Sequence, residues 1–290
     1  MLLDMNKLPA GKRIQILSQL CEGSSMRSTS RLADVSINTV TKLLVDAGRV
    51  CAGYHDEMVR GVTARRVQVD EIWSFTYAKA KNVDKAAKAP EGAGDTWTWT
   101  AIDADSKLLI SWLVGGRSLE YAVPFMQDVR DRLANRVQLT SDGHKAYLEA
   151  VETAFGADVD YAMLVKIYGA SGENETRYSP AKYLGAVPHE ITGNPNPKFI
   201  STSYAERQNL TMRMHMRRFT RLTNAFSKKF ENHMHMVALY TVFYNWTKIH
   251  KTLRVTPAMA AGLTDRVWDM ADVIAMIEQS EMLVPATHAE

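Results

Sequence analysis

The first part of the chain shows the apolar spacing of short helices. Apolar side chains recur at helical spacing over residues 8–20, and the pattern ends near Gly23. A second short helix fits residues 25–33. A third is predicted to begin after Ser36 as its N-cap and to end at Gly48. This segment therefore predicts a small all-α unit over residues 1–54.

Two short helices joined by a turn of three or four residues are typical of the helix-turn-helix, whose second helix enters the major groove of DNA. On this interpretation Asn38, Thr39 and Lys42 project from the second helix, and Arg27 and Arg31 project from the helix before it. The alternative is a three-helix packing module without DNA contacts. The spacing favours the DNA-binding interpretation.

From residue 67 the hydrophobic pattern changes to a period of two, which is typical of half-buried strands. The polar residues before it, 55–66, predict a linker. Strands are predicted at 67–77, 96–103 and 108–114. In the first strand the apolar face carries Val67, Val69, Trp73, Phe75 and Tyr77. Asp70 points away from that face, whereas Glu71 falls on it, which requires a bulge or a paired partner.

The next segments alternate between helical and strand patterns. They predict a helix over 118–134, a strand over 137–140 that runs into Asp142, a helix after it and a strand over 161–168. A carboxylate that follows a strand and precedes a helix occupies the place where open α/β sheets bind ligands. The residues from 169 to 197 predict an irregular stretch, because glycine, proline and asparagine recur there.

The last third of the chain is predicted to be helical. Ser203 and Glu206 form the pattern of a capping box, with Ser203 as the N-cap. Residues 231–251 are apolar over a wide arc, which indicates a core helix rather than a platform for base stacking. The acidic tail, 263–290, predicts a helix that packs on the core or mediates self-association.

Composition narrows the class of protein. The 290 residues are 46% hydrophobic and 23% charged, which excludes a disordered chain or a collagen, and two cysteines are too few for a disulfide scaffold. No stretch approaches the roughly 20 apolar residues of a membrane span. We therefore expect a cytoplasmic protein with no membrane partner.

The net charge of +3 hides an uneven distribution. Segments 1–66 and 198–254 carry +4 and +9, while 67–197 and 255–290 each carry −5. The most basic stretch contains no acidic residue between positions 207 and 229, which favours binding to nucleic acid. Its candidate phosphate contacts are Arg207, Arg213, Arg217, Arg218 and Arg221, with Lys228 and Lys229 beyond them.

Three carboxylates are candidate metal ligands, namely Asp70 in the first strand, Asp142 after a later strand and Glu206 on a late helix. Carboxylates brought together repel one another unless cations lie between them, and hard oxygen ligands suit Mg²⁺. Two such ions can support an in-line phosphoryl transfer. Asp103 and Asp105 lie in a turn, which favours a structural role for them.

Four stretches of this sequence carry a family resemblance: VQVDEIWSF (67–75), LTSDGHKAY (139–147), the basic helix from Ser203 to Lys229, and YNWTKIHKTLRVTPAMAAG (244–262). Together they resemble the insertion-sequence-one type of DDE transposase. The segment SMRSTSRLADVSINTVTKLL (25–44) is similar to the helix-turn-helix that precedes the catalytic core in that family.

The resemblance implies a ribonuclease-H-like α/β domain over 67–262, a mixed five-stranded sheet flanked by helices. It implies Asp70, Asp142 and Glu206 as catalytic ligands of Mg²⁺, with Mn²⁺ as a substitute. Some members carry a cysteine zinc module that this chain lacks, so no zinc is expected. The implied activity is cleavage of element ends and strand transfer into target DNA, by a homodimer or larger homo-oligomer on double-stranded DNA.

Two other classes of function remain open on the sequence. A non-enzymatic regulator would use the helix-turn-helix for DNA binding and the remainder for dimerisation or ligand binding. A nuclease would share the fold and the metals without strand transfer.

Overall fold

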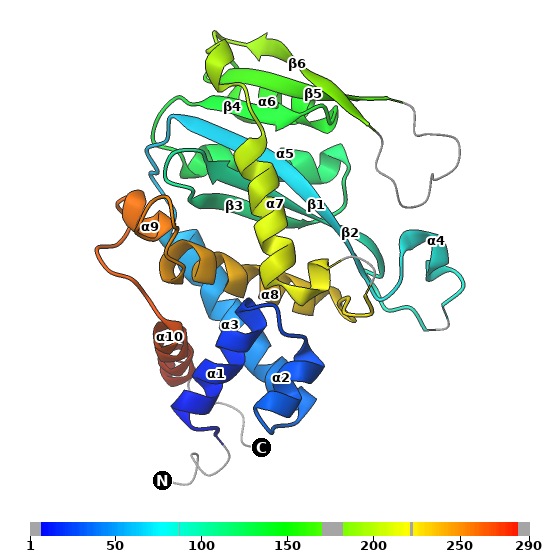
Figure 1. Cartoon of the computed structure of the whole chain (residues 1–290), viewed down its shortest axis with the longest axis vertical. Coiled ribbons are helices and arrows are strands. Elements are labelled where there is room, and N and C mark those ends of the chain that lie inside the picture. The colour runs from blue at the N-terminus through cyan, green and yellow to red at the C-terminus, as the bar shows by residue number, and fades with distance from the viewer. Residues whose placement is uncertain (1–6, 87, 170–181, 221–222, 284–290) are drawn as a thin grey trace. The chain divides into compact units, whose positions relative to one another are not determined.

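The computed structural model describes residues 7–86, 88–169, 182–220 and 223–283 (Figure 1). Contacts divide the chain into two compact units. The sheet unit comprises residues 61–72 and 98–207. The helical unit comprises residues 1–60, 73–97 and 208–290.

One mixed sheet has the strand order β3-β2-β1-β4-β5-β6 (Figure 1). Its strands are β1 (Arg66–Thr76), β2 (Gly94–Asp103), β3 (Leu109–Gly115), β4 (Gln138–Asp142), β5 (Asp160–Tyr168) and β6 (Tyr183–Thr192). β4 runs parallel to both β1 and β5, whereas β6 is antiparallel to β5. The chain is therefore a mixed α/β protein.

The expectation of five strands is wrong, because the described residues form six. β6 falls in the stretch that glycine, proline and asparagine marked as irregular, and it extends the sheet by pairing with β5 from Tyr161 opposite Thr192 to Tyr168 opposite Tyr183. Most residues of β6 are exposed, and Pro188 lies within it, as an edge strand tolerates. An exposed edge strand has no buried face, so it leaves no alternating hydrophobic signal.

Helices and aromatic side chains build the core of the sheet unit. Its helices are α5 (Leu119–Arg132) and α6 (Ala146–Phe155). The buried ring of Trp99 on β2 lies 5.8 Å from Phe125 of α5 and 5.3 Å from Tyr147 of α6. This packing supports the part of the sheet where Asp70 lies within β1 and Asp142 ends β4.

The alternation predicted for the first strand holds only in part. Val67 and Val69 are buried, but beyond the consecutive buried pair Glu71 and Ile72 the pattern reverses. Trp73 and Phe75 are partly exposed, and the small polar residues between and after them are buried. Two neighbouring buried residues shift the period-two pattern to the other face, so the prediction that Trp73 and Phe75 share the buried face is wrong.

The helical unit contains the first helices of the chain and the last ones. Its first three helices are α1 (Ala10–Cys21), α2 (Met26–Leu32) and α3 (Ile37–Met58). Ser25 and Ser36 cap α2 and α3, with Oγ accepting backbone N–H groups at 3.0 and 3.1 Å. The N-cap predicted at Ser36 is therefore confirmed.

The predicted end of the third helix at Gly48 is wrong, since α3 continues for ten further residues. Gly48 lies where α3 packs against α8 (Phe230–Val242). A Cβ atom at Gly48 would lie 2.4 Å from the Cβ of His235. This glycine permits close helix packing and does not terminate the helix.

The remaining elements are mostly short. They are α4 (Ala80–Val83), η1 (Pro197–Phe199), α7 (Ser203–His215), η2 (Arg217–Phe219), η3 (Phe243–Thr247), α9 (Pro257–Ala260) and α10 (Met270–Leu283). Tyr240 and Trp246 are buried, which confirms the core helix predicted within 231–251. In the tail α10 packs on α1 and α3 and buries Val273 and Ile277. No helix in the described ranges is long and apolar enough to cross a membrane.

Candidate metal centre

Two of the three predicted carboxylates lie on neighbouring parallel strands of the sheet unit. β1 and β4 pair with Gln68 opposite Thr140, and the same offset places Asp70 opposite Asp142. Asp70 Oδ1 accepts the N–H of Glu71, and Asp142 Oδ1 accepts the N–H of His144, both at 2.9 Å. The strand register therefore brings two residues that are 72 positions apart in the sequence to one place.

A third carboxylate, Glu71, completes a cluster with these two. One oxygen from each of Asp70, Glu71 and Asp142 lies within 4.8 Å of the others. Oxygen ligands at this spacing suit a hard cation such as Mg²⁺. These residues fit a divalent ion by the chemistry of their donors.

Glu71 is buried and paired, which explains the acidic residue on an apolar strand face. Its side chain is 1% exposed. Oε1 accepts a hydrogen bond from Nε of Arg117 at 2.8 Å and forms an ion pair with Nη2 of the same residue at 2.7 Å. The Tyr147 hydroxyl donates to Oε2 at 3.0 Å. The strand pattern predicted that this acid needs a partner, but Arg117 lies 46 positions away and could not be chosen from the pattern.

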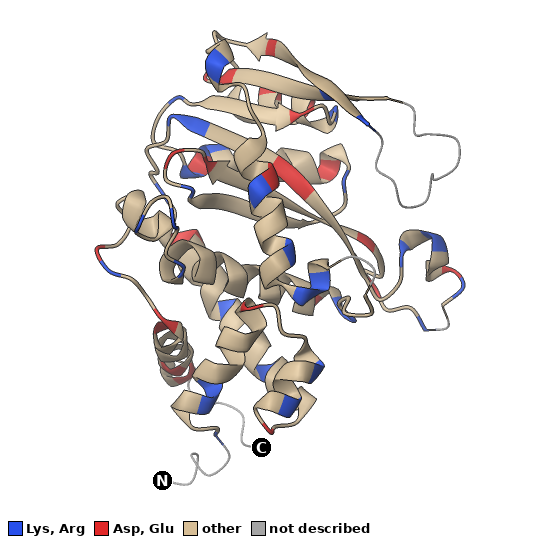
Figure 2. Cartoon of the chain, in the orientation of Figure 1, with Lys and Arg blue, Asp and Glu red and all other residues tan. Residues whose placement is uncertain are grey.

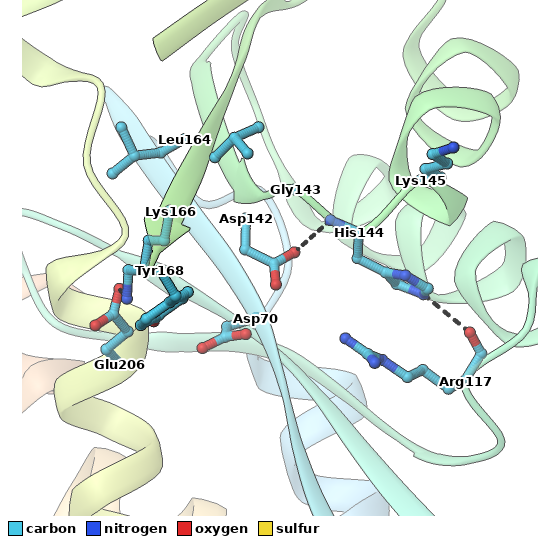
Figure 3. Close-up of a pocket in the computed structure, with 11 residues that line it drawn as sticks. Asp70, Arg117, Asp142, Gly143, His144, Lys145, Leu164, Lys166, Tyr168 and Glu206 are labelled. Carbon is cyan, nitrogen blue, oxygen red and sulfur yellow. Dashed lines mark hydrogen bonds and ion pairs between the residues drawn. The ribbon is translucent and has the colours of Figure 1, made fainter. Parts of the chain in front are cut away.

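Glu206 lines the same cavity but lies apart from the cluster. The cavity has a volume of about 690 Å³ and is lined by Asp70, Asp142 and Glu206, with Arg117, His144 and Lys166 (Figure 3). The Nζ atom of Lys166 lies 2.5 Å from Oε1 of Glu206. In Figure 3 Glu206 lies with Lys166 and Tyr168 on one side of Asp70. The third predicted ligand therefore faces the same space while it is paired with a lysine.

The helix that carries Glu206 begins differently from the predicted capping box. Thr202, not Ser203, bonds to Glu206, through Oγ1 donating to Oε1 at 2.5 Å. The amides of Tyr204 and Ala205 donate to Oε1 of Gln68 on β1, at 2.7 and 3.2 Å. The role predicted for Ser203 is wrong, because a side chain from the central strand satisfies the first amides of α7.

Burial and mutual repulsion raise the pKa values of the cluster. Burial raises the pKa of Asp70 to about 7, and the charges of Glu71 and Asp142 add to the rise. Burial also raises the pKa of Glu71, with a further contribution from Asp142, while Arg117 opposes the shift. A cation bound between such carboxyl groups offsets their mutual repulsion and stabilises their ionised form.

The carboxylates predicted to be structural are confirmed as such. Asp103 accepts the backbone N–H groups of Asp105 and Ser106, at 3.1 and 3.0 Å, which stabilises the turn after β2. Asp105 pairs with Arg66. His144 lies in the cavity wall, and its Nε2 is 3.0 Å from the carbonyl oxygen of Arg117.

The candidate DNA contacts of the first helices lie on α2 and α3. The exposed ones are Arg27, Arg31, Asn38 and Lys42. Lys42 pairs with Asp46 at 2.7 Å on the same helix. Thr39 is partly buried, and its hydroxyl lies 2.9 Å from Oγ of Ser36.

The candidate contacts of the basic stretch differ in exposure. Arg207, in the sheet unit, and Arg217, in the helical unit, are exposed, whereas Arg213 is partly buried. Nη1 of Arg218 donates to Oγ of Ser227 at 3.1 Å and to a backbone carbonyl. Arg221 lies outside the described residues.

Comparisons with known proteins find distant similarity among solved structures. No family model and no curated protein match the chain. Among solved structures, the cryo-EM structure of the piggyBac transposase synaptic complex with hairpin DNA is similar at a TM-score of 0.36 and 9% sequence identity. The alignment covers 77% of this chain and 55% of that one, so the chain spans about half its length. A similarity at this level assigns no function, and the function has to be argued from the site.

Proposed function

We propose that this chain is a DNA transposase of the DDE type, a polynucleotidyl transferase that cleaves the ends of a mobile element and joins them to target DNA. One observation carries the proposal. One oxygen from each of Asp70, Glu71 and Asp142 lies within 4.8 Å of the others, and Asp70 and Asp142 line a cavity that Glu206 also lines. The family resemblance of the stretches around Asp70, Asp142 and Glu206 supports it.

In this proposal Asp70 and Asp142 hold Mg²⁺, with Mn²⁺ as a substitute, and Glu206 completes the ligand set. When bound, two such ions supply activation of a water or a terminal hydroxyl and stabilise the leaving oxygen. Glu71 adds a fourth carboxylate, which Arg117 and Tyr147 hold in one orientation.

The cations of the cavity wall have a separate role in the proposed reaction. Lys166 and Arg117 both line the cavity and can bind the non-bridging oxygens of a phosphodiester. In the first step a water oxygen bonds to phosphorus and the 3′-oxygen leaves with a proton. In the second step that 3′-hydroxyl attacks a phosphodiester of the target and the target's own 3′-oxygen leaves.

The remaining assignments belong to the same proposal. The sheet is a ribonuclease-H-like domain with an added edge strand, and the unit formed by α2 and α3 is a helix-turn-helix that binds the element ends. The basic residues of 207–221 contact phosphates. Synapsis of two ends requires a homodimer or a larger assembly, acting on double-stranded DNA in the nucleoid. The functional boundaries are those predicted, with a catalytic domain over 67–262.

A plasmid that carries the inverted repeats flanking the gene provides the test. The parent protein should nick the repeat ends only when Mg²⁺ is present, and Asp142→Asn should lower the rate at least about a hundredfold while it retains DNA binding. The matched control is Asp105→Asn, an acid-to-amide change at a turn residue that should leave the rate unchanged. Nicking by Asp142→Asn at the parental rate would contradict the proposal.

The reaction products separate a transposase from a nuclease. Joined products that link element ends to target strands are expected from the parent protein. Hydrolysed ends that never join to a target would support a nuclease instead. An absence of Mg²⁺-dependent cleavage together with tight DNA binding would support the regulator.

A further inference from the structure

A second cavity lies entirely within the helical unit. It has a volume of about 630 Å³, and its wall joins residues from α2 and α3 to residues 217–218 and 223–228. Arg27 of α2 and Thr41 of α3 contribute from the first part of the chain, while Arg217 and Lys228 contribute from the second. Two segments that are about 190 positions apart in the sequence thus share one concave surface.

The charge of this cavity has a single sign. Four cationic side chains line it, those of Arg27, Arg217, Arg218 and Lys228, and none of the described residues in its wall is acidic. Figure 2 shows blue segments on α2 and after α7, the parts of the helical unit that form the wall. Side chains on protein surfaces usually alternate in sign, so a cavity with cations alone favours an anion.

Arg218 lacks an anionic partner among the residues that the structure describes. Its Nη1 donates to the hydroxyl of Ser227 at 3.1 Å and to the carbonyl of Asn232, which are both neutral. Burial lowers the pKa of this guanidinium to about 10, so it remains charged at neutral pH. A partly buried cation with neutral partners carries a desolvation cost that a bound anion would offset.

Neighbouring side chains hold the cavity wall in a defined shape. Ser227 is buried, and its Oγ lies 3.0 Å from Nδ1 of the buried His233. Nζ of Lys228 lies 4.0 Å from the ring centroid of Phe226, and that ring packs on Phe75 at 4.7 Å. The guanidinium of Arg218 and the ammonium of Lys228 therefore contact side chains that are themselves held by packing or hydrogen bonds. This reduces the conformational entropy lost when a ligand binds.

We infer that this cavity binds the phosphate backbone of duplex DNA and that α2 and residues 217–220 and 223–228 act as one binding surface. The inference rests on the proposed function, because it supposes that the protein binds DNA. It adds to that function one phosphate-binding surface that the proposed helix-turn-helix and the basic stretch share, and that includes Lys228. Arg27, Arg217 and Lys228 contact phosphate oxygens, and Arg218 binds a phosphate from the inner wall.

Salt dependence of binding tests the number of phosphate contacts. The full-length protein is titrated with a fluorescent 40-base-pair duplex in EDTA across about 50–300 mM KCl. Each lost contact lowers the slope of log K against log salt by about 0.9. The double variant Arg27→Gln/Lys228→Gln should therefore lose about 2 units of slope, and it leaves Arg218 and its hydrogen bonds intact. The control, Arg49→Gln, changes an exposed arginine of α3 that does not line the cavity and should keep the parental slope.

Crosslinking tests the location independently. Asn224 is exposed and lines the cavity, and the protein's own cysteines, Cys21 and Cys51, are buried. Asn224→Cys should form a disulfide with a duplex that carries activated thiol tethers on its phosphates. Glu57→Cys, an exposed site on α3 outside the cavity, should react at least about tenfold more slowly.

The outcomes separate this inference from the proposed function. The cavity is not a DNA site if the double variant keeps the parental slope, or if Asn224→Cys and Glu57→Cys crosslink equally. Either result leaves the proposed Mg²⁺-dependent cleavage standing. The expected slope and crosslink without any Mg²⁺-dependent cleavage support the cavity and overturn the transposase. A parent protein that binds no duplex overturns both.

Discussion

Replacing Asp70 by asparagine is expected to stabilise the protein at neutral and alkaline pH while it removes a proposed metal ligand. The folded state raises the pKa of Asp70 from 3.8 to about 7, first through burial and then through the charges of Glu71 and Asp142. The folded protein therefore holds a proton that the unfolded chain releases. The free energy of unfolding falls as the pH rises from the ordinary value of an aspartate towards 7, and it changes little above that.

The size of this effect follows from the shift. Between pH 5 and about pH 7 the folded protein retains a proton that the unfolded chain has released. At roughly 1.4 kcal/mol per pH unit, the free energy of unfolding falls by at most about 3 kcal/mol over this range. Asp70 is partly exposed, so solvent screening reduces the expected loss to about 1–2 kcal/mol. Asparagine keeps the acceptor for the N–H of Glu71 and carries no charge at either pH.

Urea unfolding in EDTA at pH 5 and pH 8 measures the difference. The stability of Asp70→Asn relative to the parent should grow by about 1–2 kcal/mol from pH 5 to pH 8. Glu152→Gln, the matched change of an exposed acid in the sheet unit, should show a pH-independent difference near zero. An Asp70→Asn protein whose stability relative to the parent is the same at both pH values would refute the electrostatic account of the cluster.

Three further predictions concern packing, pairing and metal binding. Gly48→Ala should lower the free energy of unfolding by about 1–3 kcal/mol, because its Cβ would lie 2.4 Å from Cβ of His235 on α8. Gly53→Ala in the same helix should raise it by about 0.5–1 kcal/mol, so equal urea midpoints for the two variants would contradict this. Arg117→Met should cost about 2 kcal/mol at pH 8 by leaving buried Glu71 without its cation, and adding Glu71→Gln should recover most of the loss, whereas an unchanged midpoint in the single variant would refute the pairing. Mg²⁺ at about ten times its Kd should stabilise the parent by about 1.4 kcal/mol and leave Asp142→Asn unaffected, so equal shifts in Tm would exclude the cluster as the binding site.

Local signals in the sequence predicted much of the fold. The N-cap at Ser36, the strand that ends at Asp142 and the buried helix within 231–251 were all predicted from neighbouring residues. Each depends on local periodicity or on a cap, and both are properties of a short segment. The edge strand β6 was missed because an exposed strand has no buried face, and the helix end at Gly48 was wrong because a distant helix, α8, sets the need for that glycine.

Part of the candidate site could be predicted from the sequence and part could not. Asp70 and Asp142 were identified from the sequence, and the parallel pairing of β1 with β4 brings them together. The pairing of Glu71 with Arg117 and of Glu206 with Lys166 depends on which strands and loops adjoin, and spacing along the chain carries no record of that.

Residue types at the site, the order of the motifs and the starts of several helices could be predicted from the sequence, because each is encoded within a few turns or strand residues. Which carboxylates form one cluster, and which cations line a cavity together with α2, depends on the folded chain. Those groups lie tens to about 190 positions apart, and the free energy that unites them comes from strand pairing and burial of the core. The repulsion of the cluster and the charge of the second cavity are therefore properties of the folded protein that composition alone does not contain.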